Sequence, residues 1–127
     1  MKLGLDIHGV IDTDPLFFSK LTKDLISTGW EVHIITGPSA EKVKKELSSW
    51  NIFYTHIFSI LDHHISLGTK IDYVGDKPYM DAVLWDRTKG DYCYREGINL
   101  HLDDTERYKN YFKTPFSLFN KTQVPLL

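Results

Sequence analysis

Carboxylates, a hydroxyl and an ammonium group stand beside three apolar runs of this sequence. The runs cover residues 3–7, 31–37 and 98–102. Asp6, Thr36, Asp103 and Asp104 lie at the ends of these runs, and Lys89 lies at the opening of the helical pattern that leads into the third. If the runs are parallel strands, their carboxyl ends open onto a common crevice, and residues far apart in sequence can meet there.

This set of residue types indicates metal-assisted phosphoryl transfer. Three carboxylates in one cleft repel one another unless a hard divalent cation lies among them, and oxygen ligands are those that Mg²⁺ prefers. A hydroxyl and an ammonium group supply donors for a phosphoryl group, and a carboxylate beside the metal can act as a nucleophile. The sequence therefore predicts Mg²⁺ as cofactor and a phosphorylated substrate.

Helical patterns separate the apolar runs and predict an α/β domain. A helix is expected from Pro15 to just before Gly29, and a second over residues 40–49 with Ser39 as its cap. Shorter helices are expected over residues 88–96 and 106–112, and a further strand over residues 54–60. Alternating strands and helices favour a central, mostly parallel sheet.

Residues 61–86 interrupt this alternation. Residues 71–74 favour a strand, Gly75 to Pro78 form a turn signal, and Tyr79 and Met80 follow, so we expect a small β-hairpin inserted in the domain. The chain ends in another apolar segment at residues 115–119.

Length and composition fit one globular domain over residues 1–127. The chain is 42% hydrophobic and 25% charged, with a formal net charge of −2. Charge therefore does not indicate a nucleic-acid or membrane partner. No run approaches the roughly 18 to 20 apolar residues of a spanning helix, and the single cysteine, Cys93, forms no internal disulfide. We expect a cytoplasmic protein.

Short motifs in this chain resemble those of the haloacid dehalogenase superfamily of phosphohydrolases. Asp6-Ile7-His8-Gly9-Val10-Ile11 is similar to its first motif, Ile34-Ile35-Thr36-Gly37 to its second, and Leu100-His101-Leu102-Asp103-Asp104 to its fourth. The motifs stand in the family's order, and the resemblance covers most of residues 3–50 and 86–112. It implies a three-layer, Rossmann-like domain.

The resemblance also implies a role for each matching residue. Asp6 would attack phosphorus and form an aspartyl-phosphate, and Thr36 would bind the phosphoryl oxygens. Lys89 would neutralise negative charge between the Asp6 carboxylate and the phosphate. Asp103 and Asp104 would hold Mg²⁺ directly or through water, together with Asp6 and the backbone carbonyl of His8.

His8 departs from the family pattern, because the family's phosphatases usually have a second aspartate two residues after the nucleophile. Imidazole, with an ordinary pKa of about 6.5, can protonate a leaving oxygen and then deprotonate water. We therefore expect a phosphatase in which His8 is the general acid and base. The alternative is a catalytically weak or degenerate module that binds phosphate or metal and acts through protein contacts.

Two other assignments are weaker. Gly75-Asp76 with Asp81 imitates another form of the fourth motif, and Lys77 competes with Lys89. Accepting them would leave Asp103 and Asp104 without an assigned role, so we favour Lys89, Asp103 and Asp104.

The histidines do not predict a zinc site. His63 and His64 are adjacent and point in different directions, and no cysteine pair accompanies them. His33 and His101 lie in expected strands, where packing is the more common role.

The chain is too short for a separate cap domain, so we expect an open cleft. Such a cleft admits bulky phosphorylated substrates, including nucleic-acid ends. The hairpin, with Tyr73, Tyr79 and nearby Trp85, could act as a small lid.

Overall fold

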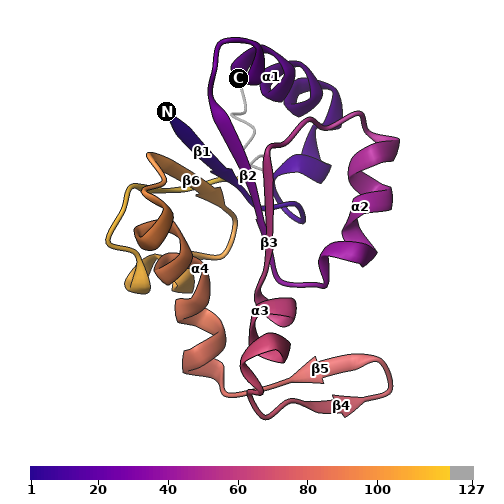
Figure 1. Ribbon diagram of the computed structural model, residues 1–127, viewed down its shortest axis with the longest axis vertical. Coiled ribbons are helices and arrows are strands. Elements are labelled where there is room, and N and C mark those ends of the chain that lie inside the picture. Colours follow the sequence, from indigo (N-terminus) through magenta and orange to yellow (C-terminus); the bar gives the residue numbers. More distant parts are fainter. Residues whose placement is uncertain (121–127) are drawn as a thin grey trace, which may run out of the picture.

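A five-stranded parallel sheet forms the centre of the protein (Figure 1). The computed structural model describes residues 1–120. The strand order is β3-β2-β1-β6-β7, and each neighbouring pair is parallel. The strands are β1 (Lys2–Leu5), β2 (Glu31–Thr36), β3 (His56–Ser59), β6 (Leu100–Asp103) and β7 (Phe116–Leu118).

The first two helices begin where the sequence predicts, at Pro15 and directly after the cap Ser39. Helix α1 (Pro15–Ser27) follows a short 3-10 turn, η1 (Ile11–Thr13), and the Asp14 side chain accepts a hydrogen bond from the Phe17 amide. Helix α2 (Ala40–Ser49) has Ser39 as its cap, whose hydroxyl accepts from the Lys42 amide. These side chains satisfy amide groups that have no partner within the helix.

Strand β2 separates two cores because its side chains alternate between the faces of the sheet. Val32 and Ile34 pack in one core with α1 and α2. Ile35 packs in the other with Tyr92 and Cys93 of α4 (Ala82–Glu96). Figure 1 shows α2 and α4 on opposite sides of β2 and β3, so helices cover both faces of the sheet. The predicted α/β class with a parallel central sheet is confirmed.

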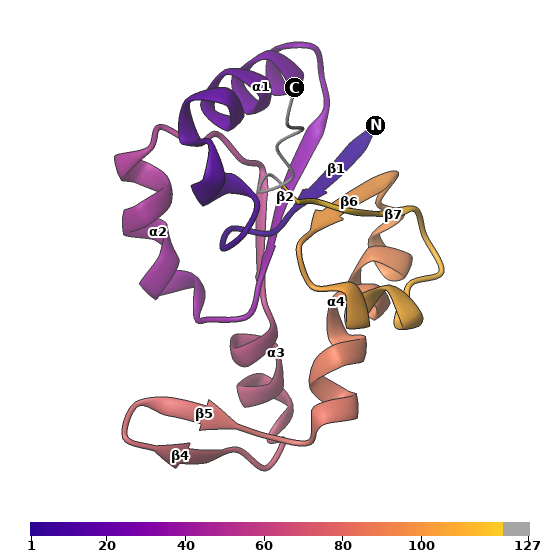
Figure 2. The same cartoon turned by 180° about the vertical axis from the view of Figure 1, so that it is seen from behind.

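Residues 61–86 contain more helix than the sequence analysis expects. Helix α3 (Ile60–Leu67) starts directly after β3, with the Ser59 hydroxyl accepting from the Asp62 amide, and it ends at Gly68 in a left-handed conformation. The predicted hairpin is present as β4 (Asp72–Val74) and β5 (Lys77–Tyr79). It projects beyond the sheet at the end of α3 (Figures 1 and 2).

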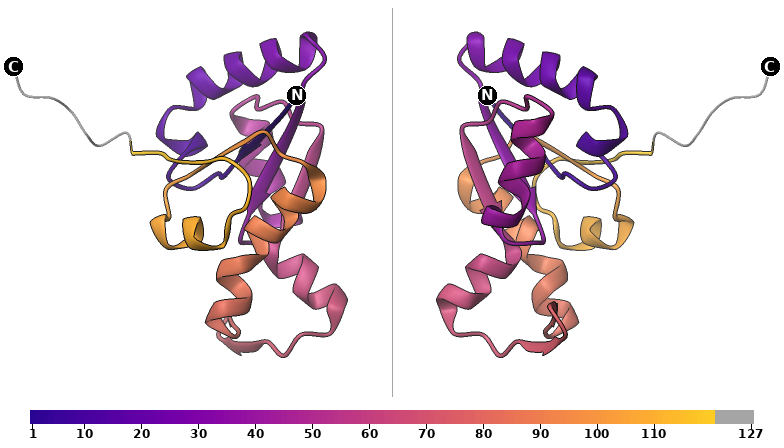
Figure 3. Two further views of the ribbon diagram at one scale, coloured as in Figure 1. Left: turned by 90° about the vertical axis from the view of Figure 1, so that its left-hand side faces the viewer. Right: turned by 90° about the vertical axis from the view of Figure 1, so that its right-hand side faces the viewer.

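Helix α4 is longer than predicted, since it begins at Ala82 and not at Thr88. The Asp81 carboxylate accepts from the Leu84 amide and caps the helix six residues earlier than expected. The predicted helix over residues 106–112 is the 3-10 helix η2 (Glu106–Tyr111). Side views show α3 and α4 running toward the hairpin together (Figure 3). Within residues 1–120, no helix has the length and apolar character needed to cross a bilayer.

Candidate functional site

Asp6 lies immediately beyond the carboxyl end of β1, at the centre of the sheet. Its backbone amide donates to the Leu102 carbonyl at 3.1 Å, and the residue is 7% exposed. The loop that follows passes close to Asp104: Gly9 has a φ of +87°, and a Cβ there would overlap the Asp104 carboxylate. Glycine at this position therefore allows the loop after β1 to approach the Asp104 side chain.

Lys89 of α4 lies between two buried carboxylates. Its Nζ is 3.2 Å from Asp6 Oδ1 and 2.8 Å from Asp103 Oδ2, and its side chain is 2% exposed. The ammonium also lies 5.1 Å from the ring centre of Tyr108. The structure therefore brings Lys89 to Asp6, whereas Lys77 is an exposed residue of the hairpin.

Asp103 accepts hydrogen bonds on both of its oxygens. Oδ2 accepts from Lys89 Nζ and from His101 Nε2, at 2.8 and 2.9 Å, and Oδ1 accepts from the Thr105 amide at 3.1 Å. His101 is fully buried. Because it precedes Asp103 by two residues on β6, its side chain shares the same face of the strand. Asp103 is thus held in place and orients Lys89 in turn.

Three carboxylates converge at this edge of the sheet. An oxygen from each of Asp6, Asp103 and Asp104 lies within 4.8 Å of the other two. An all-oxygen set with one exposed member, Asp104, fits a hard cation such as Mg²⁺, which keeps several of its waters. The predicted convergence of Asp6, Lys89, Asp103 and Asp104 is present in the structure.

Burial and charge move the pKa values of this cluster in opposite directions. Burial, together with the charge of Asp103, raises the pKa of Asp6, although Lys89 opposes the shift. Burial alone would also raise the pKa of Asp103, but hydrogen bonds and charge from His101 and Lys89 hold it below its usual range. Burial opposes the charge of Lys89, yet the two carboxylates raise the pKa of its ammonium group. In the metal-free cluster, Asp103 is therefore the ionised partner of Lys89.

Thr36 ends β2 beside this cluster. Leu5 pairs with Ile34, so Asp6 and Thr36 both lie within two residues of the last paired position of their strands. Thr36 is fully buried, and its hydroxyl has no hydrogen-bond partner within residues 1–120. Buried polar groups are normally paired, so an unpartnered hydroxyl here fits a group that accepts its hydrogen bond on binding.

His8 is placed differently from the other predicted residues. Its imidazole is half-exposed, and its Nε2 lies 3.4 Å from Glu46 Oε2 of α2. Within the described part of the chain, the acidic partner of His8 is therefore Glu46 and not Asp6.

Sequence reasoning missed the supporting roles of His101 and Tyr108. The spacing of His101 and Asp103 on one predicted strand is the signal that could have identified the first. Tyr108 accepts a hydrogen bond from Trp85 Nε1 at 3.1 Å, and the Trp85 ring packs against Gly37. No local pattern predicts this contact, because it joins α4, η2 and the loop after β2.

A cavity of about 650 Å³ is lined in part by Pro38 and Ser39, in the loop that follows Thr36 and β2. Trp85 forms one wall, and the first turn of α2, the start of α3 and the hairpin form the others. Lys42 and Lys77 give it positive charge, and Asp76 adds one carboxylate. Tyr73 and Tyr79 of the expected lid are exposed on the hairpin and do not line this cavity.

The chain matches no protein-family model, no curated protein and no solved structure. Its function must therefore be inferred from the geometry of the site.

Proposed function

We propose that this protein is a Mg²⁺-dependent phosphatase of the haloacid dehalogenase type that uses Asp6 as its nucleophile. The observation that carries the proposal is the position of Asp6 at the carboxyl edge of the sheet. Its carboxylate lies 3.2 Å from the buried Lys89 ammonium and in one cluster with Asp103 and Asp104. The proposed nucleophile, the ammonium group that would offset its charge and the proposed cation ligands therefore lie in one cluster.

In the first step, an Asp6 oxygen attacks phosphorus while the bond to the leaving oxygen breaks, which gives an aspartyl-phosphate and an alcohol. The leaving oxygen needs a proton, and water then needs to lose one when it attacks phosphorus and releases inorganic phosphate from Asp6. We assign both proton transfers to His8. Its half-exposed ring must leave Glu46 to reach the substrate.

The other residues stabilise charge. Thr36 donates its free hydroxyl to a phosphoryl oxygen, and Lys89 offsets negative charge that develops near Asp6. Asp6 and Asp104 would hold Mg²⁺, which would supply further charge stabilisation. Asp103, whose oxygens already accept hydrogen bonds, orients Lys89 and would hold the ion directly or through water.

The ion pair between His8 and Glu46 favours a second candidate function. If His8 stays with Glu46, the protein lacks a general acid beside Asp6 and binds phosphate or metal with little turnover. Such a module would act through protein contacts.

Asp6→Asn distinguishes the two candidates. We expect wild type to release phosphate from p-nitrophenyl phosphate only with Mg²⁺, and Asp6→Asn to release none, because an amide cannot attack phosphorus. Since burial already favours the neutral form of Asp6, the variant is expected to keep the fold. Asp24→Asn, on the exposed side of α1, is the matched control.

If wild type shows no Mg²⁺-dependent release from aryl or alkyl esters, the phosphatase proposal is wrong. Binding of Mg²⁺ or inorganic phosphate without turnover would then support the binding module.

A further inference from the structure

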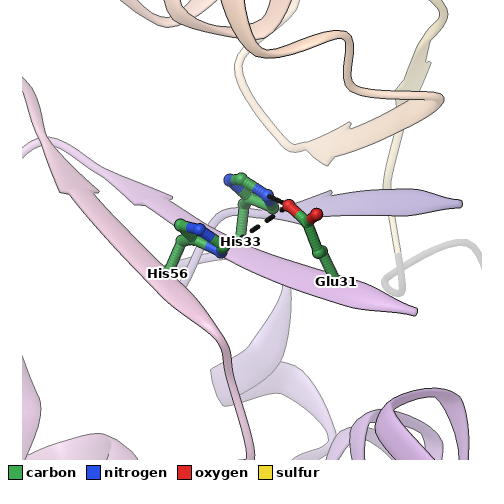
Figure 4. Close-up of side chains that lie close together, drawn as sticks. All are labelled: Glu31, His33 and His56. Atoms are coloured by element: carbon green, nitrogen blue, oxygen red, sulfur yellow. Dashed lines mark hydrogen bonds and ion pairs between the residues drawn. The ribbon is translucent and has the colours of Figure 1, made fainter. Parts of the chain in front are cut away.

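Two histidines and a glutamate converge on a face of β2 and β3 (Figure 4). His33 and His56 are paired across the two parallel strands, and Glu31 precedes His33 by two residues on the same face. A ligand atom from each lies within 4.8 Å of the other two. Strand alternation and the β2–β3 register thus bring two imidazole nitrogens and a carboxylate oxygen together.

We infer that Glu31, His33 and His56 bind a divalent transition-metal ion of the zinc class, with water completing its coordination. Imidazole nitrogen with one carboxylate is a donor set that suits Zn²⁺, Co²⁺ or Ni²⁺, whereas Mg²⁺ prefers oxygen ligands alone. The site is thus chemically distinct from the acidic cluster and does not depend on the proposed phosphatase activity.

His33 has the surroundings of a metal ligand. The side chain is 1% exposed, its Nε2 lies 2.8 Å from Glu31 Oε1, and its Nδ1 lies 2.6 Å from the Tyr92 hydroxyl of α4. Metal-binding histidines usually have a hydrogen bond at the second ring nitrogen, which fixes the tautomer. In a neutral ring, Nε2–H donates to Glu31 and Nδ1 accepts from the Tyr92 hydroxyl. Metal binding at Nε2 requires the other tautomer, in which Nδ1–H donates to the Tyr92 oxygen.

His56 is the most solvent-exposed of the three proposed ligands. It lies on the edge strand, its side chain is 47% exposed, and its Nδ1 lies 2.9 Å from the Thr55 hydroxyl. The rings of His33 and His56 stack with centroids 4.2 Å apart and an interplanar angle of 3°. Because a nitrogen lone pair lies in the ring plane, one ion cannot bind both parallel rings, and the exposed His56 ring must turn when metal binds.

Lys2 is the competing cation at this site. Its Nζ lies 3.8 Å from Glu31 Oε1 and also donates to the Glu96 carbonyl at 2.7 Å. Metal binding would move the Glu31 carboxylate away from the Lys2 ammonium group, which would still donate to the Glu96 carbonyl. Both side chains are partly exposed, so this ion pair is weak and costs little to break.

The ion would hold the edge strand β3 against β2 and would not take part in chemistry at Asp6. Glu31 precedes Thr36 by five residues, which is roughly 16 Å along an extended strand. Because an ion that binds only the folded chain stabilises it by mass action, Zn²⁺ should raise the melting temperature.

Calorimetric titration of the full chain with Zn²⁺ in excess Mg²⁺ tests this site. We expect one Zn²⁺ to bind wild type, His56→Ala to bind it at least tenfold more weakly, and His63→Ala to match wild type. His63 is the control because it lies on α3, with its ring against Phe58. Zn²⁺ should raise the melting temperature of wild type and His63→Ala but not of His56→Ala.

A second variant separates the two candidate metal sites. Asp104→Asn removes an acidic ligand and should leave Zn²⁺ binding unchanged. The inference is wrong if wild type binds no Zn²⁺, or if His56→Ala binds it as tightly as wild type does. It is also wrong if Asp104→Asn loses the ion while His56→Ala keeps it. The phosphatase proposal is tested separately, by phosphate release, and does not fail if the Zn²⁺ site does.

Discussion

Lys89 is the residue on which the acidic cluster depends. Its ammonium is almost fully buried and contacts both Asp6 and Asp103. Desolvating charges is costly unless partners are close and well oriented, and the hydrogen bonds from His101 and Thr105 complete that arrangement. This network favours the ionised form of Asp103, while Asp6 lies at the carboxyl end of β1.

Under the proposed phosphatase function, His8 is the residue that supplies and removes protons. If it is the general acid and base, His8→Ala should lower kcat by about 10²-fold or more. The loss should be greater on an alkyl phosphate than on p-nitrophenyl phosphate, because a poor leaving group depends more on protonation. His8→Asp should recover part of the rate. Steady-state kinetics of the three proteins measure the effect.

Glu46→Gln is the matched control for His8, since it removes the ion-pair partner and keeps the imidazole. Its kcat should stay within a fewfold of wild type. Equal rates for wild type, His8→Ala and His8→Asp on both substrates would contradict the assigned role.

At the scale of elements, helix boundaries explain most of the differences between prediction and structure. The caps Asp14 and Ser39 stand directly before apolar helical patterns, and α1 and α2 were predicted correctly. Helix α3 was not predicted because His63 and His64 interrupt its apolar pattern, although His64 is buried. Tertiary contacts make this polar residue part of the core.

His64 connects α3 to α4, and this contact should make stability fall with acidity. Its ring nitrogens lie 2.9 Å from the Thr69 hydroxyl and 2.8 Å from the Thr88 hydroxyl. Burial lowers the pKa of His64 in the folded protein. Above the ordinary pKa of about 6.5, both states are neutral; below it, the unfolded chain binds a proton that the native state does not.

The free energy of unfolding should therefore decrease as the pH falls below about 6.5, by at most about 1.4 kcal/mol per pH unit for this group. His64→Gln cannot titrate and should lose less stability between pH 7.5 and pH 5.5. Urea unfolding measures both values. If His64→Gln loses as much unfolding free energy as wild type over this pH range, His64 does not contribute to the pH dependence.

At the scale of the whole molecule, parallel strands give the two ends of the sheet different chemistry. The acidic cluster and Thr36 lie at the carboxyl ends of the strands, whereas Glu31 lies at the start of β2. The cavity beside Trp85 forms only where α2, α3, α4 and the hairpin come together. It therefore depends on the assembled fold and not on any one segment.

Lys42 and Lys77 should make this cavity favour substrates with a second anionic group. If the phosphatase proposal holds, the double variant Lys42→Ala/Lys77→Ala should raise KM for a sugar bisphosphate about three- to tenfold, with kcat unchanged. A three- to tenfold change corresponds to about 0.7 to 1.4 kcal/mol for the two lysines together, which lies within the roughly 0.2 to 1 kcal/mol that each exposed ion pair contributes. Kinetics on the bisphosphate and on p-nitrophenyl phosphate make the comparison.

The KM for p-nitrophenyl phosphate should stay unchanged, because that ester has no second charge. Lys45→Ala, on the exposed side of α2, is the control. A double variant with unaltered KM for the bisphosphate would show that the cavity does not bind its second phosphate.

Local patterns predict the strands of the sheet, helices α1 and α2 and the acidic residues at the strand ends, since caps and apolar periods are local. Which of these residues meet depends on tertiary packing. The contact of Lys89 with Asp6 joins elements far apart in the chain, and the His33–His56 stack depends on the β2–β3 register. The position of His8 beside Glu46 likewise follows from how α2 packs on the sheet. Such contacts arise from packing between distant segments, which no local pattern encodes.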